Sequence, residues 1–416
     1  MPNLTSLLGL VTMIALAWLM SSHKKRFPWR IVLSGLVLQF VFAVLILKTS
    51  AGRAVFEQVD LIFVSLLDSV DVGSKFMFGD SFKDHFFAFR VLPTIIFFSA
   101  FMSIFYYFGI IQKVVGLLAA VMQKTLGTSG AETLSSAANI FVGQTEAPLV
   151  IRPYISTMTT SELNAVMVGG FATMAGGVLG ALSAMGINAG HLLSASVISA
   201  PGALLIAKVM QPEVDTPKTK GHVSIDVDDS SVNVLEAIAH GTTGGLQLAL
   251  NVGAMLIVFL ALIAVINGLL GWTGTQFGFV DADGKALWSM QAILGTLFYP
   301  LAWLIGIELG DCGKAAELMG MKMATNEFIA YDALAKLAPL NAEGVASTEV
   351  ISERTRQIMT YALCGFANFS SIGIQLGGIG GIAPERRSDL AQLGLRAMLG
   401  GTLAAFMTAC IASLLI

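Results

Sequence analysis

The sequence predicts an all-α integral membrane protein with about eight transmembrane helices, two opposed re-entrant helical hairpins and interfacial helices, arranged as inverted repeats. Composition is the first observation behind this fold class: of 416 residues, 55% are hydrophobic and 12% are charged, against about 25% charged residues in soluble proteins. The second is a series of apolar segments long enough to cross a bilayer. The third is a pair of polar interruptions, at residues 139–148 and 326–328, in similar settings in the two halves.

Charge and cysteine content exclude several classes of protein. The net charge of −3 argues against nucleic acid as a partner. Cys312, Cys364 and Cys410 lie far apart and have neither metal-site spacing nor a disulfide pattern. The first apolar run is followed, not preceded, by its basic cluster at residues 23–26. No small-residue cleavage site comes after it, so we interpret it as a retained transmembrane helix and not as a signal peptide.

Apolar windows define the expected membrane spans. The predicted spans are residues 4–21, 30–48, 88–110, 160–184, 191–210, 246–271, 355–381 and 391–415. Basic residues at 24–30 predict a cytoplasmic loop after the first span. Residues 52–70 are too polar to span and predict an interfacial amphipathic helix. Residues 212–232, rich in Asp, Ser and Pro, predict a water-soluble linker between the halves.

The first hairpin is predicted around residues 139–148 (NIFVGQTEAP). Residues 131–142 (AETLSSAANIFV) are typical of a helix, and Pro148 suits the first turn of a second one. Arms of about a dozen residues are roughly 18 Å long, too short for a hydrocarbon core of about 30 Å. The polar tip therefore lies at membrane depth, where broken backbone must be buried in protein or line a cavity.

The second half repeats this order. Residues 314–325 form a short helical segment that leads to Asn326 and Glu327, and a long span with its own polar break follows. The charge bias of the loops places the starts of the two repeats on opposite sides of the membrane. Inverted repeats with interrupted hydrophobic segments are typical of secondary transporters and indicate a binding site near the bilayer midplane.

Four polar breaks are candidates for this site, and each has a simpler interpretation. The break at residues 144–146 could be a surface loop, and the break at 173–177 could serve only close helix packing. The break at residues 326–328 could be a surface turn. In the fourth, Asn368 and Ser371 share one helix face, and a buried amide needs a ligand or a side-chain partner.

The side chains at these breaks indicate the chemistry of the ligand. Amides, hydroxyls and the carboxylates of Glu146 and Glu327, with few cations nearby, favour a neutral, hydroxyl-rich, partly aromatic solute. Half-helix ends also expose carbonyls, which with Asn139 or Thr173 suit a small hard cation. The two glutamates could instead be a catalytic pair, but no nucleophile motif accompanies them. We therefore expect a transporter and not an enzyme.

Three segments resemble the signatures of a known family. These are Gly143-Gln-Thr-Glu-Ala-Pro148 with Arg152-Pro153, Asn-Glu-Phe at 326–328, and Cys364-Gly-Phe-Ala-Asn-Phe-Ser-Ser371. They are similar to the concentrative nucleoside transporters, in order over nearly the whole chain, in the short bacterial form with eight spans. The chemistry of the side chains at the polar breaks supports only a neutral polar solute with a cation. The resemblance alone implies that the solute is a nucleoside.

The resemblance implies a role for each site residue. By motif, Gln144, Thr145 and Glu146 would contact the nucleobase. The other implied substrate residues are Val178 and Leu248 at the base, and Glu327, Phe366, Asn368 and Ser371 at the ribose. The implied sodium ligands are the side chains of Asn139 and Thr173 and the carbonyls of Val142 and Met174. Serine is associated with position 173 in the family, and threonine keeps its hydroxyl.

The resemblance also implies an assembly and a mechanism. The expected division is scaffold helices with the interfacial helix at 1–110, a transport domain with the first hairpin at 111–211, linker and scaffold helix at 212–275, and a transport domain with the second hairpin at 276–416. The expected protein is a homotrimer in the bacterial inner (plasma) membrane that couples nucleoside import to a sodium gradient by alternating access, with no other cofactor. Proton coupling and a passive channel for small polar solutes remain the alternatives.

Overall fold

A computed structural model of the chain describes residues 2–219, 231–280, 286–339 and 350–416. Every named element in these ranges is a helix, and the extended pairing described there is a single antiparallel bridge between Val280 and Ala286. The predicted all-α class is therefore confirmed. Residues 220–230 of the expected linker lie outside the described part of the chain.

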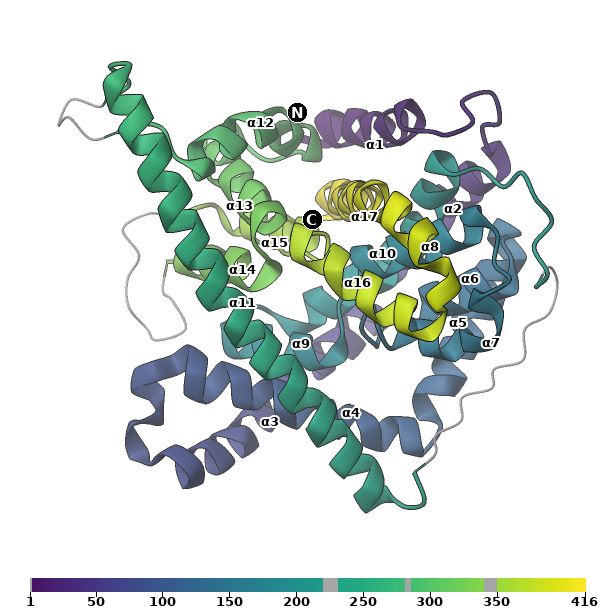
Figure 1. Cartoon of the computed structure of the whole chain (residues 1–416), viewed down its shortest axis with the longest axis horizontal. Coiled ribbons are helices and arrows are strands. Elements are labelled where there is room, and N and C mark those ends of the chain that lie inside the picture. The colour runs from purple at the N-terminus through teal and green to yellow at the C-terminus, as the bar shows by residue number, and fades with distance from the viewer. Residues whose placement is uncertain (1, 220–230, 281–285, 340–349) are drawn as a thin grey trace.

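The first part of the chain and one later helix form an outer group. Its elements are α1 (Pro2–Leu19), α2 (Trp29–Leu47), α3 (Ser50–Phe78), η1 (Asp80–His85), η2 (Phe87–Val91), α4 (Leu92–Tyr107) and α11 (Val234–Gln276). Helix α11 packs against α4 and runs as a long diagonal along one side of the molecule (Figure 1). It is much longer than the span predicted at 246–271.

The first repeat follows α4. Its elements are α5 (Ile110–Leu126), α6 (Gly130–Ala138), η3 (Ala147–Ile151), α7 (Arg152–Ile155), α8 (Thr160–Ala172), α9 (Gly176–Ala184) and α10 (Ala189–Met210). Capping boxes start α6, with Ser129 and Glu132, and α8, with Thr159 and Glu162. Each box satisfies backbone donors at its helix start, and the start of α6 is buried in protein.

The second repeat has the same order of elements. They are α12 (Met290–Ile305), α13 (Cys312–Ala324), α14 (Glu327–Lys336), α15 (Glu353–Ala362), α16 (Phe369–Ile382), η4 (Pro384–Arg386) and α17 (Arg387–Leu415). In both repeats a helical hairpin precedes a long helix that is broken in the middle. The fourth and seventh predicted spans are these broken helices, α8–α9 and α15–α16, and the other predicted spans coincide with α1, α2, α4, α10, α11 and α17.

Burial separates the inner helices from the outer ones. In the most apolar 18-residue stretch of each segment, 94% of α8–α9 and 89% of α10 are buried, whereas only 19% of α11 is buried although its hydropathy is the highest of the six candidate spans. Exposing the apolar surface of a helix such as α11 to water would be energetically unfavourable, whereas exposing it to the hydrocarbon core of a membrane is not. The described chain contains six helical segments long and apolar enough to cross a membrane. The outer helices therefore face lipid or another protein, and the hairpins lie on the inner helices.

An ion-pair cluster holds the base of the first hairpin. Lys208 on α10 lies 2.7 Å from a carboxylate oxygen of Glu132 on α6 and 3.2 Å from one of Glu213. The backbone N–H of Gly130 donates to the carbonyl of Thr219 at 2.9 Å. Lys208 and Glu132 are almost fully buried, so removing either partner would leave an uncompensated charge in the interior.

The hairpins differ from the predicted helices in their details. The helix predicted at 131–142 ends at Ala138, and the second arm is divided between η3 and α7. Pro153 explains the division, because it lacks a backbone donor and disrupts a continuous α-helix, whereas Pro148 lies in the first turn of η3. The second hairpin has a tighter turn, with Thr325 and Asn326 between α13 and α14. The predicted interfacial helix is α3, which extends past residues 52–70.

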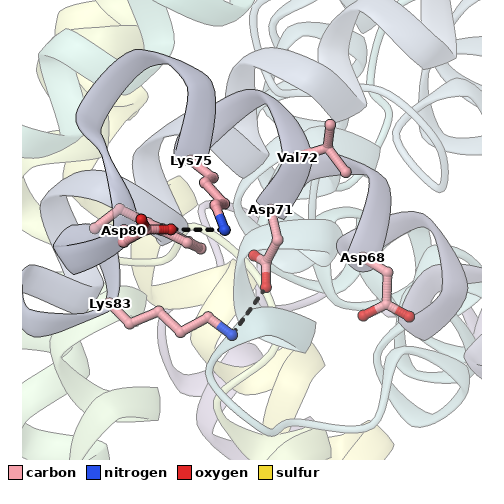
Figure 2. A pocket seen from close by; sticks show the side chains of 7 residues that line it. Asp68, Asp71, Val72, Lys75, Asp80 and Lys83 are labelled. Atoms are coloured by element: carbon pink, nitrogen blue, oxygen red, sulfur yellow. Dashed lines mark ion pairs between the residues drawn. The ribbon is translucent and has the colours of Figure 1, made fainter.

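A surface hollow of about 380 Å³ lies beside α3 and η1 (Figure 2). Lys75 pairs with Asp80 at 2.6 Å and Lys83 with Asp71 at 3.5 Å across it. Both lysine side chains and that of Asp80 are mostly exposed, and exposed ion pairs contribute only about 0–1 kcal/mol. The hollow takes no residue from the hairpins or the broken helices, so it is not the candidate site.

Candidate functional site

The first hairpin tip, residues 139–146, is joined directly to the break in the fourth span, residues 173–175. The N–H of Gly176 donates to the carbonyl of Phe141 at 2.9 Å. Thr173 ends α8 in an extended conformation, and Ala175 precedes α9 in the same region. Backbone is therefore released from helical pairing on both sides of this contact, as a midplane binding site requires.

Asn139 lies at the C-terminal end of α6 with one donor paired and its acceptor free. Its Nδ2 donates to the carbonyl of Ser135 at 3.0 Å. Its Oδ1 is buried and has no hydrogen-bond partner within the described chain. The hydroxyl of Thr173 donates to the carbonyl of Gly169 at 2.9 Å, which leaves its oxygen lone pairs available. A buried amide oxygen and a hydroxyl oxygen fit a small hard cation.

The remaining tip residues face two directions. Gln144 is buried, and its Oε1 accepts a hydrogen bond from Nε2 of Gln375 on α16 at 3.0 Å. Thr145 packs against Gly378, where a Cβ atom would approach its methyl group to 2.6 Å. Glu146 is exposed, and its carboxylate folds over Gly143, where a Cβ atom would collide with it.

The second hairpin meets the break in the seventh span, residues 363–368. Nδ2 of Asn368 donates to Oε2 of Glu327 at 3.0 Å, and both side chains are buried. Oδ1 of Asn368 accepts from the N–H of Ser371 at 2.9 Å and so caps α16. Asn326 caps α14 in the same way through the N–H of Ile329. Amide side chains thus start the helices on both sides of Glu327.

The two broken spans also contact each other. Ser196 on α10 accepts from the N–H of Met174 at 3.3 Å, and its hydroxyl lies 3.7 Å from the thiol of Cys364. Gly365 has φ +97°, and a Cβ atom there would lie 2.7 Å from the carbonyl carbon of Ala172. Only glycine permits this conformation and this close approach. The two repeats therefore meet at their interruptions.

A cavity of about 750 Å³ opens beside the first hairpin tip. Of the predicted site residues, Val142, Glu146 and Leu248 line it. The other predicted residues lie outside its lining: Asn139, Gln144, Thr145, Thr173, Met174, Val178, Glu327, Phe366, Asn368 and Ser371. Val178 is fully buried in α9, and Phe366 is buried in the seventh-span break. The cavity therefore reaches the base side of the expected site and not the ribose side.

Two residues near the hairpins did not stand out in the sequence. Lys322 on α13 is buried and donates to the carbonyl of Cys364 at 3.0 Å, so one cation lies beside the seventh-span break. Gln375 is buried and contacts Gln144. Its position four residues after Ser371 predicts a shared helix face, and that spacing was the signal available.

Three protein-family profiles match consecutive parts of the chain. Profiles described as "Na+ dependent nucleoside transporter N-terminus", "Nucleoside recognition" and "Na+ dependent nucleoside transporter C-terminus" match residues 8–81, 88–188 and 191–413. The C-terminal profile alone covers more than half of the chain. The chain belongs to this family of nucleoside transporters. The family resemblance and the expectation that the chain is not an enzyme are therefore confirmed.

Relatives within the family include bacterial and animal proteins. An "Uncharacterized transporter" of Haemophilus influenzae is 47% identical, and the match covers 100% of this chain and 98% of that protein. "Solute carrier family 28 member 3" of Eptatretus stoutii is 45% identical over 98% of this chain. "Sodium/nucleoside cotransporter 2" of Mus musculus is 43% identical over 99%. The chain spans 60% of the hagfish protein and 63% of the mouse protein.

Solved structures of the family member CNTnw share the fold. One, in an inward-facing substrate-bound state, has a TM-score of 0.90 and 41% identity and covers 100% of this chain and 98% of that chain. A CNTnw variant in an outward-facing state has a TM-score of 0.91 and 40% identity, with coverage of 100% and 99%. CNTnw has therefore been captured in conformations open to either side of the membrane.

Proposed function

We propose that this chain is a secondary active symporter that imports nucleosides across the bacterial inner membrane and is driven by a sodium gradient. The observation that carries the proposal is the contact of both hairpin tips with broken helices of the inner core. Gln144 pairs with Gln375 on α16, and Glu327 pairs with Asn368 at the start of the same helix. One helix thus links a base-side amide to a ribose-side carboxylate, as a small two-part substrate requires.

Each group of side chains has chemistry that suits one part of a nucleoside. The oxygens of Glu327 accept hydrogen bonds from ribose hydroxyls, while Asn368 and Ser371 orient them and Phe366 packs beside the sugar. Gln144, Thr145 and Glu146 bind the polar edge of the base. Val178 and Leu248 pack on its faces, and Leu248 already lines the cavity at the first tip.

Sodium binds at the first hairpin in this proposal. The orphaned Oδ1 of Asn139 and the hydroxyl of Thr173 are its side-chain ligands, and the carbonyls of Val142 and Met174 complete the set. Oxygen ligands of this kind suit a hard cation. Because Asn139 begins the tip that carries Gln144, cation binding orders the base-side residues. Each ligand then raises the affinity for the other by the same factor.

Alternating access divides the chain into moving and fixed parts. The fixed scaffold comprises residues 1–110 and 212–275, and the transport domain comprises 111–211 and 276–416. The burial of α8–α9, α10 and α17 inside the protein, against the exposure of α4 and α11, supports this division. The exposed apolar faces of the scaffold leave surface for contacts within a homotrimer and with lipid.

Uptake of labelled uridine and adenosine into proteoliposomes tests the proposal. An inward sodium gradient should drive accumulation above the external concentration, and replacing sodium with choline at fixed pH should abolish it. Uptake that survives in choline and follows a proton gradient would instead identify a proton symporter. Equilibration without accumulation would identify a passive channel, and recovery of modified nucleoside would identify an enzyme.

A further inference from the structure

We propose that Gln375 fixes the hydrogen-bond polarity of Gln144, so that Gln144 presents N–H donors to the nucleobase. Gln375 is then a positioning residue that sets base preference without touching the substrate. The inference rests on the proposed contact of Gln144 with the base. It adds the direction of that hydrogen bond and the residue that enforces it.

The direction of the hydrogen bond between Gln375 and Gln144 follows from a nearby backbone carbonyl, because a carbonyl oxygen can only accept a hydrogen bond. Nε2 of Gln375 lies 3.1 Å from the carbonyl oxygen of Met167 on α8 and 3.0 Å from Oε1 of Gln144. Reversing the amide of Gln375 would place its oxygen against the Met167 carbonyl, and two acceptors repel each other. The amide nitrogen of Gln375 therefore faces this junction, and Gln144 must turn its oxygen toward it.

Consequently the amide nitrogen of Gln144 is directed away from Gln375. A primary amide carries two donors on nitrogen and its acceptor on oxygen. Because Oε1 points toward Gln375, the N–H pair is the part of the amide that points elsewhere and can meet a substrate. The structure therefore favours a base that offers an acceptor, such as a ring carbonyl, over one that offers an amino group at the same position.

The backbone of α8 leaves space for this contact at Gly170. A Cβ atom there would lie 2.8 Å from Nε2 of Gln375 and 2.9 Å from Cβ of Gln144, closer than real side chains approach. Gln375 is fully buried, and its Oε1 has no partner within the described chain. What distinguishes this buried amide is that its nitrogen donates to both Gln144 and the Met167 carbonyl, which supports an orienting role.

The same face of α16 serves both ends of the expected substrate. Ser371, Gln375 and Gly378 follow at intervals of four and three residues and therefore share one face. Gly378 packs on Thr145 and Gln375 on Gln144, while Ser371 lies at the ribose end. About 10 Å of helix separates Ser371 from Gly378, which matches the length of one small solute.

Gln375→Glu tests the orientation directly. When protonated, the new carboxyl donates its single hydrogen to the Met167 carbonyl and turns an oxygen toward Gln144. Gln144 then reverses its amide and presents Oε1 to the base. Relative to the unmodified protein, the uridine-to-cytidine ratio of kcat/KM should fall about tenfold, the size of one reversed hydrogen bond. An unchanged ratio in a variant that still transports would overturn the proposal.

Gln39 on α2 supplies a matched control. It is fully buried, its Nε2 donates to the carbonyl of Ile198 at 3.0 Å, and its Oε1 also has no partner within the described chain. It makes none of these contacts with a hairpin. Gln39→Glu makes the same chemical change in the same kind of environment, and it should leave the uridine-to-cytidine ratio unaltered.

Two further measurements test the inference even if the Gln375→Glu variant does not fold. Gln375→Met keeps the side-chain volume but removes the amide that orients Gln144, so the uridine-to-cytidine ratio of kcat/KM should move toward one. In the unmodified protein, 2- and 4-thiouridine replace one base carbonyl each with a weaker acceptor, and at least one should compete with uridine about tenfold less well. If both thiouridines competed as well as uridine itself, the inference would be overturned. Absence of both uridine and adenosine uptake by the unmodified protein would instead overturn the proposed function.

Discussion

Nδ2 of Asn368 donates a hydrogen bond to Oε2 of Glu327 at 3.0 Å, which joins the first residue of α14 to the cap of α16. The pair is buried, and it connects the second hairpin to the seventh-span break. One amide donor leaves other lone pairs on the carboxylate free. Glu327 can therefore accept from substrate hydroxyls while Asn368 holds it in place.

Replacing Glu327 with glutamine should impair transport strongly. The amide retains an acceptor for Asn368 but loses the charge that strengthens hydrogen bonds to ribose hydroxyls. We expect kcat/KM for uridine to fall about 100-fold, the equivalent of about 2.7 kcal/mol. Glu317→Gln on the partly exposed face of α13 should have no effect. Normal uridine uptake by the Glu327 variant would contradict its assignment.

Asn368 has two functions that substitutions can separate. Serine at this position can still cap α16 but is too short to reach Glu327, so Asn368→Ser should lose uptake and keep most of the stability. Asn368→Ala should in addition lose about 1 kcal/mol from the missing cap, measured as a lower unfolding temperature in detergent. Asn188→Ala removes the corresponding cap of α10; if it reduced uptake as much, the functional role of Asn368 would be in doubt.

Thr173→Val tests the cation site with a substitution of nearly equal size. Loss of the hydroxyl should raise the sodium concentration for half-maximal uptake about tenfold or more, with the base preference unchanged. Thr402 is a control, because its side chain is also buried and donates to a carbonyl four residues before it. Sodium dependence that is equal in Thr173→Val and Thr402→Val would remove Thr173 from the ligand set.

The ion-pair cluster at the base of the first hairpin should be important for stability. Lys208→Met leaves the buried Glu132 without its cation and should cost about 3–5 kcal/mol. Combining it with Glu132→Gln should recover part of the loss, because the uncompensated charge is gone. Lys336→Met, which breaks an exposed pair with Asp332, should cost at most about 1 kcal/mol. Thermal unfolding of the unmodified protein and the three purified variants provides the comparison.

The sequence by itself determined the class of the protein and the places where its helices break. Hydropathy located the membrane helices, because the period and length of apolar runs are local properties. The polar residues at 144–146, 326–328 and 368–371 marked both hairpin tips and the seventh-span break for the same reason. The motifs also determined the family, since they resemble its signature segments. The helix predicted to continue to residue 142 was wrong at its end, where the chain turns at Asn139 to meet Gly176.

Only the tertiary structure decided which of these polar groups meet. Gln375 and Gln144 are 231 positions apart, and no periodicity along the chain indicates that the two side chains share a hydrogen bond. Lys322 was overlooked because a lysine on a short helix is ordinarily exposed, and its burial against the Cys364 carbonyl depends on how α13 packs. Local sequence sets helix ends and polarity, whereas the pairing of buried donors with acceptors depends on packing between distant segments.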